Sequence, residues 1–201
     1  MKIFAALTLS LGIGINAGYS QSLDDLINGC NDCHGDNGVS KWEDVPTVAG
    51  ISAFVHSDAL YLYRDGERPC MDSEYRQGDT ARPATNMCQV AKGLSDDQIE
   101  TLAEHYSELP FVAAKQPFDA ARATAGKAVH DRDCERCHVK GGADPEEDAS
   151  ILAGQWMGYL AATFKEYASG ERDQPEKMKQ KMDPLSEADI QALLHYYASQ
   201  Q

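Results

Sequence analysis

Two copies of one five-residue pattern, Cys-x-x-Cys-His, constrain this chain more than any other feature. The first copy occupies residues 30–34 and the second residues 134–138. Paired cysteines followed at once by a histidine are the signature of covalent c-type haem attachment, in which the thiols become thioethers and the histidine binds the iron. A zinc site would need two further ligands for each pair. The sequence therefore predicts two covalently bound haem c groups. Their predicted ligands are Cys30, Cys33, His34, Cys134, Cys137 and His138.

The N-terminus has the pattern of a secretory signal peptide. Met1-Lys2 precedes an apolar run over residues 3–15, and small residues follow it at Ala17, Gly18 and Ser20. The run is shorter than the about 20 apolar residues that cross a bilayer, and no later stretch comes close. Because haem is attached to such chains outside the cytoplasm, we expect a periplasmic protein that has lost residues 1–20 and has no membrane insertion.

An internal repeat divides the rest of the chain. The two haem motifs are 104 residues apart, and the same offset pairs residues 63–68 (YRDGER) with 167–172 (YASGER). Nearer the C-terminus the offset falls to 91, where Met87 pairs with Met178 and Leu94-Ser95 with Leu185-Ser186. Repeats of this kind indicate duplicated units. The change of offset places an insertion of 13 residues between Arg68 and Met87.

The repeat and the helical periodicity together predict an all-α protein with two haem domains. We expect a signal peptide over 1–20, domain 1 over 21–109 with the insertion, a Pro-bounded linker over 110–117 and domain 2 over 118–201. Ser95 and Ser186 have the position of helix N-caps. The predicted helices are 22–33, 57–65 and 95–109 in domain 1, and 121–137, 159–169 and 186–200 in domain 2. Domains this small usually need a cofactor in the core.

The repeat also selects the sixth ligand of each iron. Met87 and Met178 each stand seven residues before the Leu-Ser that begins the last helix, so each can lie on a loop over the distal face of its haem. Thioether ligation raises the potential of a His-ligated haem, which suits an electron carrier. Met71 and Met182 are the alternatives. The remaining histidines have no partner in the repeat and are expected at the surface: His56, His105, His130 and His195.

The sequence also predicts groups around the haems. The carbonyls of Pro46 and Ser150, each twelve residues after a motif histidine, are placed to accept its ring N–H. Side chains that could contact haem propionates are Tyr63, Arg68, Trp156, Tyr167 and Arg172.

Two cysteines remain outside the haem motifs. Cys70 and Cys88 bracket the inserted segment, and an even remainder in an exported chain usually pairs. We predict a Cys70–Cys88 disulfide that clamps Met87 on the iron. Its absence would favour Cys88 as a thiolate ligand.

The surface is strongly acidic. Against 18 Lys and Arg the chain has 32 Asp and Glu, for a formal net charge of −14. Such a surface repels nucleic acid and favours a small basic redox partner, although it also suits solubility in salty surroundings.

The pattern of haem motif, Ala-Gly, Tyr…Gly-Glu-Arg, Met and Leu-Ser, present twice, resembles the dihaem cytochromes of the c-four type. This resemblance covers the whole mature chain and implies two tandem class I cytochrome c domains related by a pseudo-twofold axis. Residues 114–119 (AKQPFD), 134–142 (CERCHVKGG), 151–156 (ILAGQW) and 197–201 (YASQQ) are more similar to the cytochrome subunit of flavocytochrome c sulfide dehydrogenase. That resemblance implies a flavoprotein partner, and the insertion in domain 1 departs from it.

Three functions follow as hypotheses. The first is an electron-transfer subunit or acceptor of a flavoprotein that oxidises sulfide, with no catalytic residue of its own. The second is a free c-four-type shuttle to a terminal oxidase. The third is a dihaem enzyme that oxidises a sulfur compound directly, with a cysteine as haem ligand.

Overall fold

The computed structural model describes residues 21–145 and 149–201, and the predicted signal peptide lies outside them. Over these residues the protein is helical, and beyond one isolated bridge between Ser73 and Thr85 they contain no β-structure. The all-α prediction is therefore confirmed. The elements are α1 (Leu23–His34), η1 (Asp36–Gly38), α2 (Ala53–Asp65), α3 (Met87–Lys92), α4 (Asp96–Ser107), α5 (Ala120–Asp133), α6 (Val139–Gly142), α7 (Met157–Ser169), α8 (Glu176–Met182) and α9 (Glu187–Ala198).

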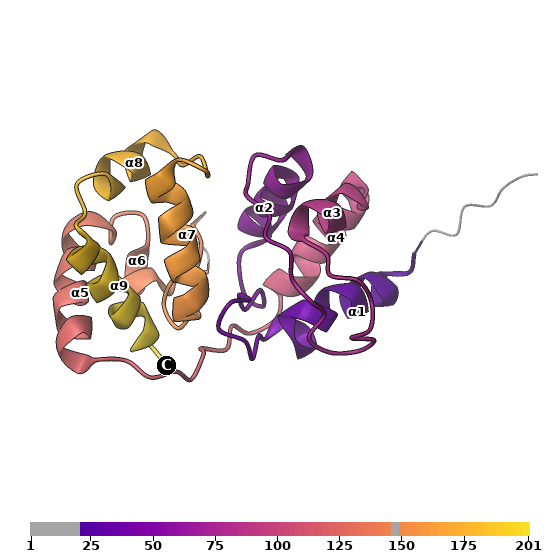
Figure 1. Cartoon of the computed structure of the whole chain (residues 1–201), viewed down its shortest axis with the longest axis horizontal. Coiled ribbons are helices and arrows are strands. Elements are labelled where there is room, and N and C mark those ends of the chain that lie inside the picture. Colours follow the sequence, from indigo (N-terminus) through magenta and orange to yellow (C-terminus); the bar gives the residue numbers. More distant parts are fainter. Residues whose placement is uncertain (1–20, 146–148) are drawn as a thin grey trace, which may run out of the picture.

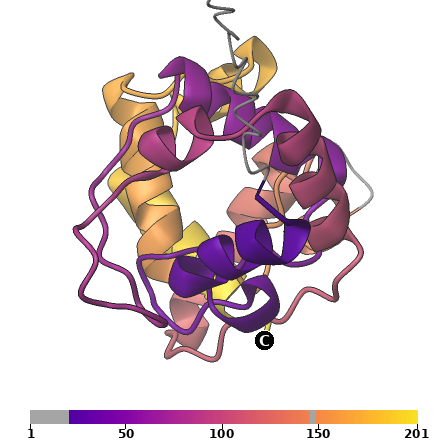
Figure 2. The same cartoon turned by 90° about the vertical axis from the view of Figure 1, so that its right-hand side faces the viewer.

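The helices form two halves that lie side by side (Figure 1). Helices α1 to α4 make the first half and α5 to α9 the second, and an extended segment joins them. Figure 2 looks along the long axis with the first half in front. None of the helices in the described part of the chain is long and apolar enough to cross a bilayer.

The repeat is preserved in the helices. α2 and α7 have the same length and lie 104 residues apart, and α4 and α9 lie 91 residues apart. The predicted N-caps are confirmed, since Ser95 and Ser186 each accept the backbone N–H three residues on and complete a capping box.

The prediction for the helix before the second haem motif was wrong. α1 runs through its motif to His34, but α5 ends at Asp133, so residues 134–138 form a turn. The backbone hydrogen bonds leave the α-helical register there, since the Glu135 N–H donates to the His130 carbonyl, five residues back, at 2.9 Å. The Glu135 carboxylate accepts the N–H of Lys140 at 3.0 Å and of Gly141 at 3.2 Å. α2 and α7 also begin earlier than predicted, at Ala53 and Met157.

Each half has its own small core. In the first half Leu26, Leu102 and Tyr106 are buried together, and the larger cluster of the second half lies between α5, α7 and α9. The C-terminal helix of each repeat supplies most of these residues. The cluster of the second half comprises Val129, Leu160, Phe164, Leu193, Leu194, Tyr196 and Tyr197.

Gly126 permits the close crossing of α5 and α9. A Cβ at this position would overlap the Ala192 carbonyl and lie 2.8 Å from the Tyr196 Cβ. We therefore expect Gly126→Ala to lower the free energy of unfolding by about 1–3 kcal/mol through overpacking, measured by denaturant unfolding of the holoprotein.

Gly29 is the matched control for this prediction. It lies inside α1 and a Cβ there would meet nothing within 4 Å, so Gly29→Ala should raise stability by about 0.5–1 kcal/mol through helix propensity. Equal effects of the two substitutions would contradict the packing argument.

Candidate haem sites

Both motif histidines are oriented by a backbone carbonyl. His34 is buried at the end of α1, and its Nδ1 lies 2.9 Å from the Pro46 carbonyl, while the Nδ1 of His138 lies 3.2 Å from that of Ser150. A carbonyl can only accept, so each Nδ1 carries the proton and each Nε2 keeps its lone pair. Both are the carbonyls that were predicted from the sequence to accept these ring N–H groups. Burial lowers the pKa of both His34 and His138, which favours the neutral imidazole that binds a metal.

The loop that supplies these carbonyls is built in the same way in both halves. The Gly38 carbonyl accepts the N–H groups of Val48 and Ala49, and that of Gly142 accepts those of Leu152 and Ala153. The predicted Ala-Gly pair then ends the loop, where the N–H of Gly50 or Gly154 donates to the carbonyl of the last helix's tyrosine.

The donor set of the four motif cysteines fits covalent haem attachment. All four are free of disulfides, whereas the two other cysteines of the chain are bonded. The hydroxyls of Tyr106 and Tyr197 lie beside the first thiol of each motif, Cys30 and Cys134. Free thiols at this spacing are what thioether formation requires.

The methionines differ in their surroundings. Met87 begins α3 and Met178 lies in α8, and both are half-buried. Met71 is 67% exposed, and Met182 packs against the core of the second half. A half-buried thioether outside the core is available to an iron, whereas a core methionine fills space. This favours Met87 and Met178 over their alternatives.

The predicted disulfide between Cys70 and Cys88 is confirmed, with the two Cα atoms 5.9 Å apart. It closes the inserted segment directly beside Met87. Because the sulfur of Cys88 is bonded to Cys70, it does not supply a thiolate ligand.

We expect Cys88→Ser to destabilise the first half by about 3 kcal/mol, the loop-closure contribution of a bridge of this span. It should also weaken the Met-to-iron charge-transfer band of haem 1 and leave haem 2 unchanged, because the loop no longer holds Met87. Chemical denaturation and visible absorption spectra measure the two effects. Cys70→Ser is the control, since it removes the same bond without changing the residue next to Met87. A band weakened by Cys88→Ser but not by Cys70→Ser would contradict the clamping role.

A Tyr–Arg pair from each half meets at the boundary between the halves. The Arg68 guanidinium lies 4.4 Å from the Tyr63 ring centre, and that of Arg172 lies 4.6 Å from that of Tyr167. Arg68 Nη2 donates to the Tyr159 hydroxyl of the other half at 2.9 Å. Burial raises the pKa of Tyr63 to about 12.

Two guanidinium nitrogens in this cluster are buried without a hydrogen bond, Arg68 Nε and Arg172 Nη1, although Arg172 Nη1 forms an ion pair with the Glu166 carboxylate at 3.8 Å. A buried donor without a hydrogen bond is costly, so Arg68 Nε in particular points to a missing acceptor. A haem carries two propionate carboxylates, which would supply acceptors here. Arg68 and Arg172 at the boundary therefore fit a role in holding haem propionates.

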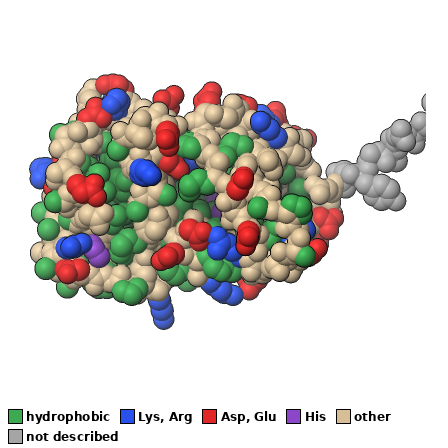
Figure 3. Space-filling model, viewed as in Figure 1, with side chains coloured by type: hydrophobic (Ala, Val, Ile, Leu, Met, Phe, Trp, Pro, Cys, Tyr) green, Lys and Arg blue, Asp and Glu red, His purple; other side chains and the backbone are tan. Residues whose placement is uncertain are grey.

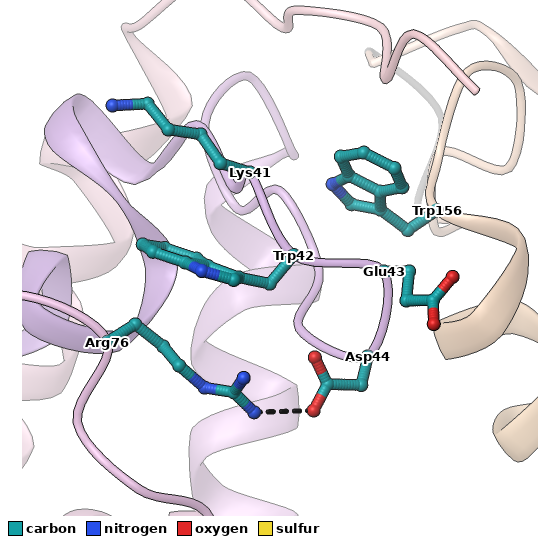
Figure 4. A pocket seen from close by; sticks show the side chains of 6 residues that line it. All are labelled: Lys41, Trp42, Glu43, Asp44, Arg76 and Trp156. Atoms are coloured by element: carbon teal, nitrogen blue, oxygen red, sulfur yellow. Dashed lines mark hydrogen bonds and ion pairs between the residues drawn. The ribbon is translucent and has the colours of Figure 1, made fainter.

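Hydrogen bonds to backbone groups join the two halves. The Gln155 side-chain amide both accepts from the Thr47 N–H and donates to the Thr47 carbonyl, each at 2.9 Å. The Tyr159 N–H donates to the Glu43 carbonyl at 2.8 Å. The Trp156 indole donates to the Ser40 carbonyl at 3.0 Å, and its predicted contact with a propionate stays a prediction. Figure 4 shows Trp156 facing Trp42 across a hollow of about 620 Å³ between the halves.

Two histidines expected at the surface are packed inside the protein. His130 is fully buried, with Nδ1 2.9 Å from the Tyr197 hydroxyl and Nε2 2.6 Å from the Glu135 carboxylate. His56 is half-buried and its Nε2 lies 2.7 Å from the Val48 carbonyl. One sequence feature could have indicated that His130 is buried. At the offset of 104 it corresponds to Leu26, an apolar residue that is buried in the first half.

Comparisons with known proteins agree with this geometry. A family described as cytochrome C oxidase, cbb3-type, subunit III matches residues 121–196. Cytochrome c-554(548) of Halomonas halodenitrificans is 34% identical over 91 residues, which are 96% of that protein and 45% of this chain. A thiosulfate dehydrogenase electron acceptor of Thiomonas intermedia is 28% identical over 183 residues, covering 85% of this chain and 78% of that protein.

Among solved structures, cytochrome c4 of Pseudomonas stutzeri matches with a TM-score of 0.70 and 22% identity. The match covers 90% of this chain and 100% of that one. At this identity the likeness concerns the fold, and it confirms the prediction of two tandem domains of this helical class.

Proposed function

Because this chain belongs to the cytochrome c family and carries two covalent haem c groups, we propose that it is a periplasmic electron carrier for a dehydrogenase of reduced sulfur compounds. Electron transfer is the activity of the family. The sulfur-oxidising donor and the compartment are the parts proposed here.

In this proposal Cys30, Cys33, His34 and Met87 hold one haem, and the second is held by Cys134, Cys137, His138 and Met178. Each haem supplies a one-electron couple at its iron. The Pro46 and Ser150 carbonyls keep the histidine rings oriented for ligation through Nε2. The Tyr–Arg pairs at the boundary would hold the propionates.

The contacts between the halves support transfer from one haem to the other. Gln155 with Thr47 and Trp156 with Ser40 bind backbone groups, so the two attachment motifs keep a constant separation. An electron that enters one domain can then leave from the other without a large movement of the protein.

We choose a thiosulfate dehydrogenase as the donor because this chain is similar to the thiosulfate dehydrogenase electron acceptor over 85% of its length. A flavoprotein sulfide dehydrogenase is the second candidate, supported by the sequence resemblance over residues 110–201.

The test mixes the oxidised holoprotein with three electron sources. These are a thiosulfate dehydrogenase with thiosulfate, a flavoprotein sulfide dehydrogenase with sulfide, and a quinol-oxidising membrane complex. Stopped-flow absorbance should show that a sulfur dehydrogenase reduces both haems fastest. Preferential reduction by the membrane complex would replace the proposal with a respiratory shuttle. Reduction by thiosulfate without a dehydrogenase would instead identify a dihaem enzyme.

A further inference from the structure

The two haem motifs differ in what covers them. In the first half, the segment of residues 69–86, here termed the strap, lies on the motif. The backbone N–H groups of Arg76 and Gln77 donate to the Asp32 carbonyl at 2.8 and 3.0 Å. Arg82 forms an ion pair with the Asp32 carboxylate. Asp32 is the residue directly before Cys33, so the strap covers the edge at which haem 1 is attached.

The strap is held in this position at several points. The Cys70 disulfide closes it, Ser73 and Thr85 pair its two arms, and the Arg82 guanidinium lies 3.5 Å from the Tyr75 ring centre. Figure 2 shows the two arms running together along one edge of the first half. Arg76 forms an ion pair with Asp44 (Figure 4). At Gly78, which has a φ of +67°, a Cβ would overlap the Asp32 carboxylate.

Among the described residues of the second half, 110–145 and 149–201, no segment corresponds to the strap. The connection from α7 to α8 spans only residues 170–175, and Cys137 is exposed where Cys33 is partly covered. The first repeat is 13 residues longer than the second, and this extra length lies in the strap that covers the first haem motif.

The residues at the two edges also differ in the sign of their charge. At the offset of 104, Arg136 corresponds to Asp32, and Lys140, which forms an ion pair with Asp144 at 2.6 Å, corresponds to Asp36. Glu135 is turned to His130 and to the backbone at residues 140 and 141, so among the described residues the exposed charge next to Cys137 in the chain is the Arg136 guanidinium. On the face in Figure 3, carboxylates are spread over both halves, which makes a basic edge in this acidic protein distinctive.

We propose that the strap closes the haem 1 edge, and that electron exchange with a partner takes place at the haem 2 edge, where Arg136 binds an acidic rim on that partner. One electron crosses in this exchange, the partner's redox centre changing by one electron in the opposite direction, and no bond is made or broken. The inference rests on haem attachment at both motifs. A haem count of two per chain, established first, separates a failure of attachment from a failure of this inference.

The experiment uses two redox-inert paramagnetic probes on the oxidised holoprotein and follows the haem methyl NMR signals. A neutral gadolinium chelate reports exposure, and hexacyanochromate(III) reports attraction of anions. Signals of haem 2 are identified as those that Met178→Ala shifts. Both probes should broaden the haem 2 signals more than those of haem 1. Equal broadening of both haems by the neutral chelate would overturn closure by the strap.

Two variants sharpen the test. Gly78→Val should lift the strap from Asp32 and expose the haem 1 signals to the neutral chelate. Arg136→Glu should slow the oxidation of haem 2 by hexacyanoferrate(III) by about tenfold and remove its broadening by the chromium probe. Lys92→Glu, the same charge change on an exposed residue of α3, should alter that rate by less than about twofold. Equal slowing by both charge variants would show a global charge effect and overturn the assignment to Arg136.

Discussion

A variant with Cys134→Ala and Cys137→Ala is expected to carry one haem per chain, and its second half is expected to lose cooperative unfolding. That half depends on one cluster between α5, α7 and α9, which is a small core for a domain of this size. Removing the porphyrin takes away the cofactor that a domain with so small a core usually needs. Haem content by pyridine haemochrome and far-UV circular dichroism melting measure the two effects.

The matched control for this experiment is Cys30→Ala with Cys33→Ala, which should remove haem 1 and unfold the first half instead. The Cys70–Cys88 bridge remains in that variant, so residual structure should concentrate around the strap. A haem-free second half that still melts in one sharp transition would show that the protein core suffices without the cofactor.

Met178→Ala is expected to remove about half of the Met-to-iron charge-transfer absorbance of the oxidised protein, because one of two thioether ligands is lost. The same variant should bind carbon monoxide at one site per chain when reduced, and the potential of that haem should fall. The half-buried position of Met178 outside the core cluster is the reason to expect a change of ligation with little loss of packing. Visible spectra, carbon monoxide titration and redox titration follow the three changes.

Met182→Ala separates ligation from packing. Its side chain contacts the core cluster of the second half, so the substitution should lower stability by about 2–3 kcal/mol and keep the charge-transfer band. If Met182→Ala abolished the band and Met178→Ala kept it, Met182 would be the ligand. Met87→Ala and Met71→Ala form the corresponding pair in the first half, where Met71 is 67% exposed.

The features that could be predicted from the sequence depend on neighbours along the chain or on covalent chemistry. The haem motifs are contiguous, and the caps at Ser95 and Ser186 involve groups three residues apart. The repeat offset aligned the two halves and identified the insertion. Cys70 and Cys88, the two cysteines outside the haem motifs, lie on either side of it and could bond only to each other. The Pro46 and Ser150 carbonyls were found because both stand at the same distance from a motif histidine.

Only the tertiary structure decided which groups meet across large separations. Trp156 binds the Ser40 carbonyl and Gln155 binds Thr47, although more than 100 residues separate each pair, and the burial of His130 follows from the packing of α5 on α9. The end of α5 before the second motif is a change of backbone hydrogen bonding at residues 134–138, and the cover over Cys33 depends on where the strap lies. Such contacts form wherever backbone donors and acceptors need partners once the helices have packed. The sequence by itself therefore determined the chemistry at each haem motif, and the tertiary structure determined that the strap lies on the first motif.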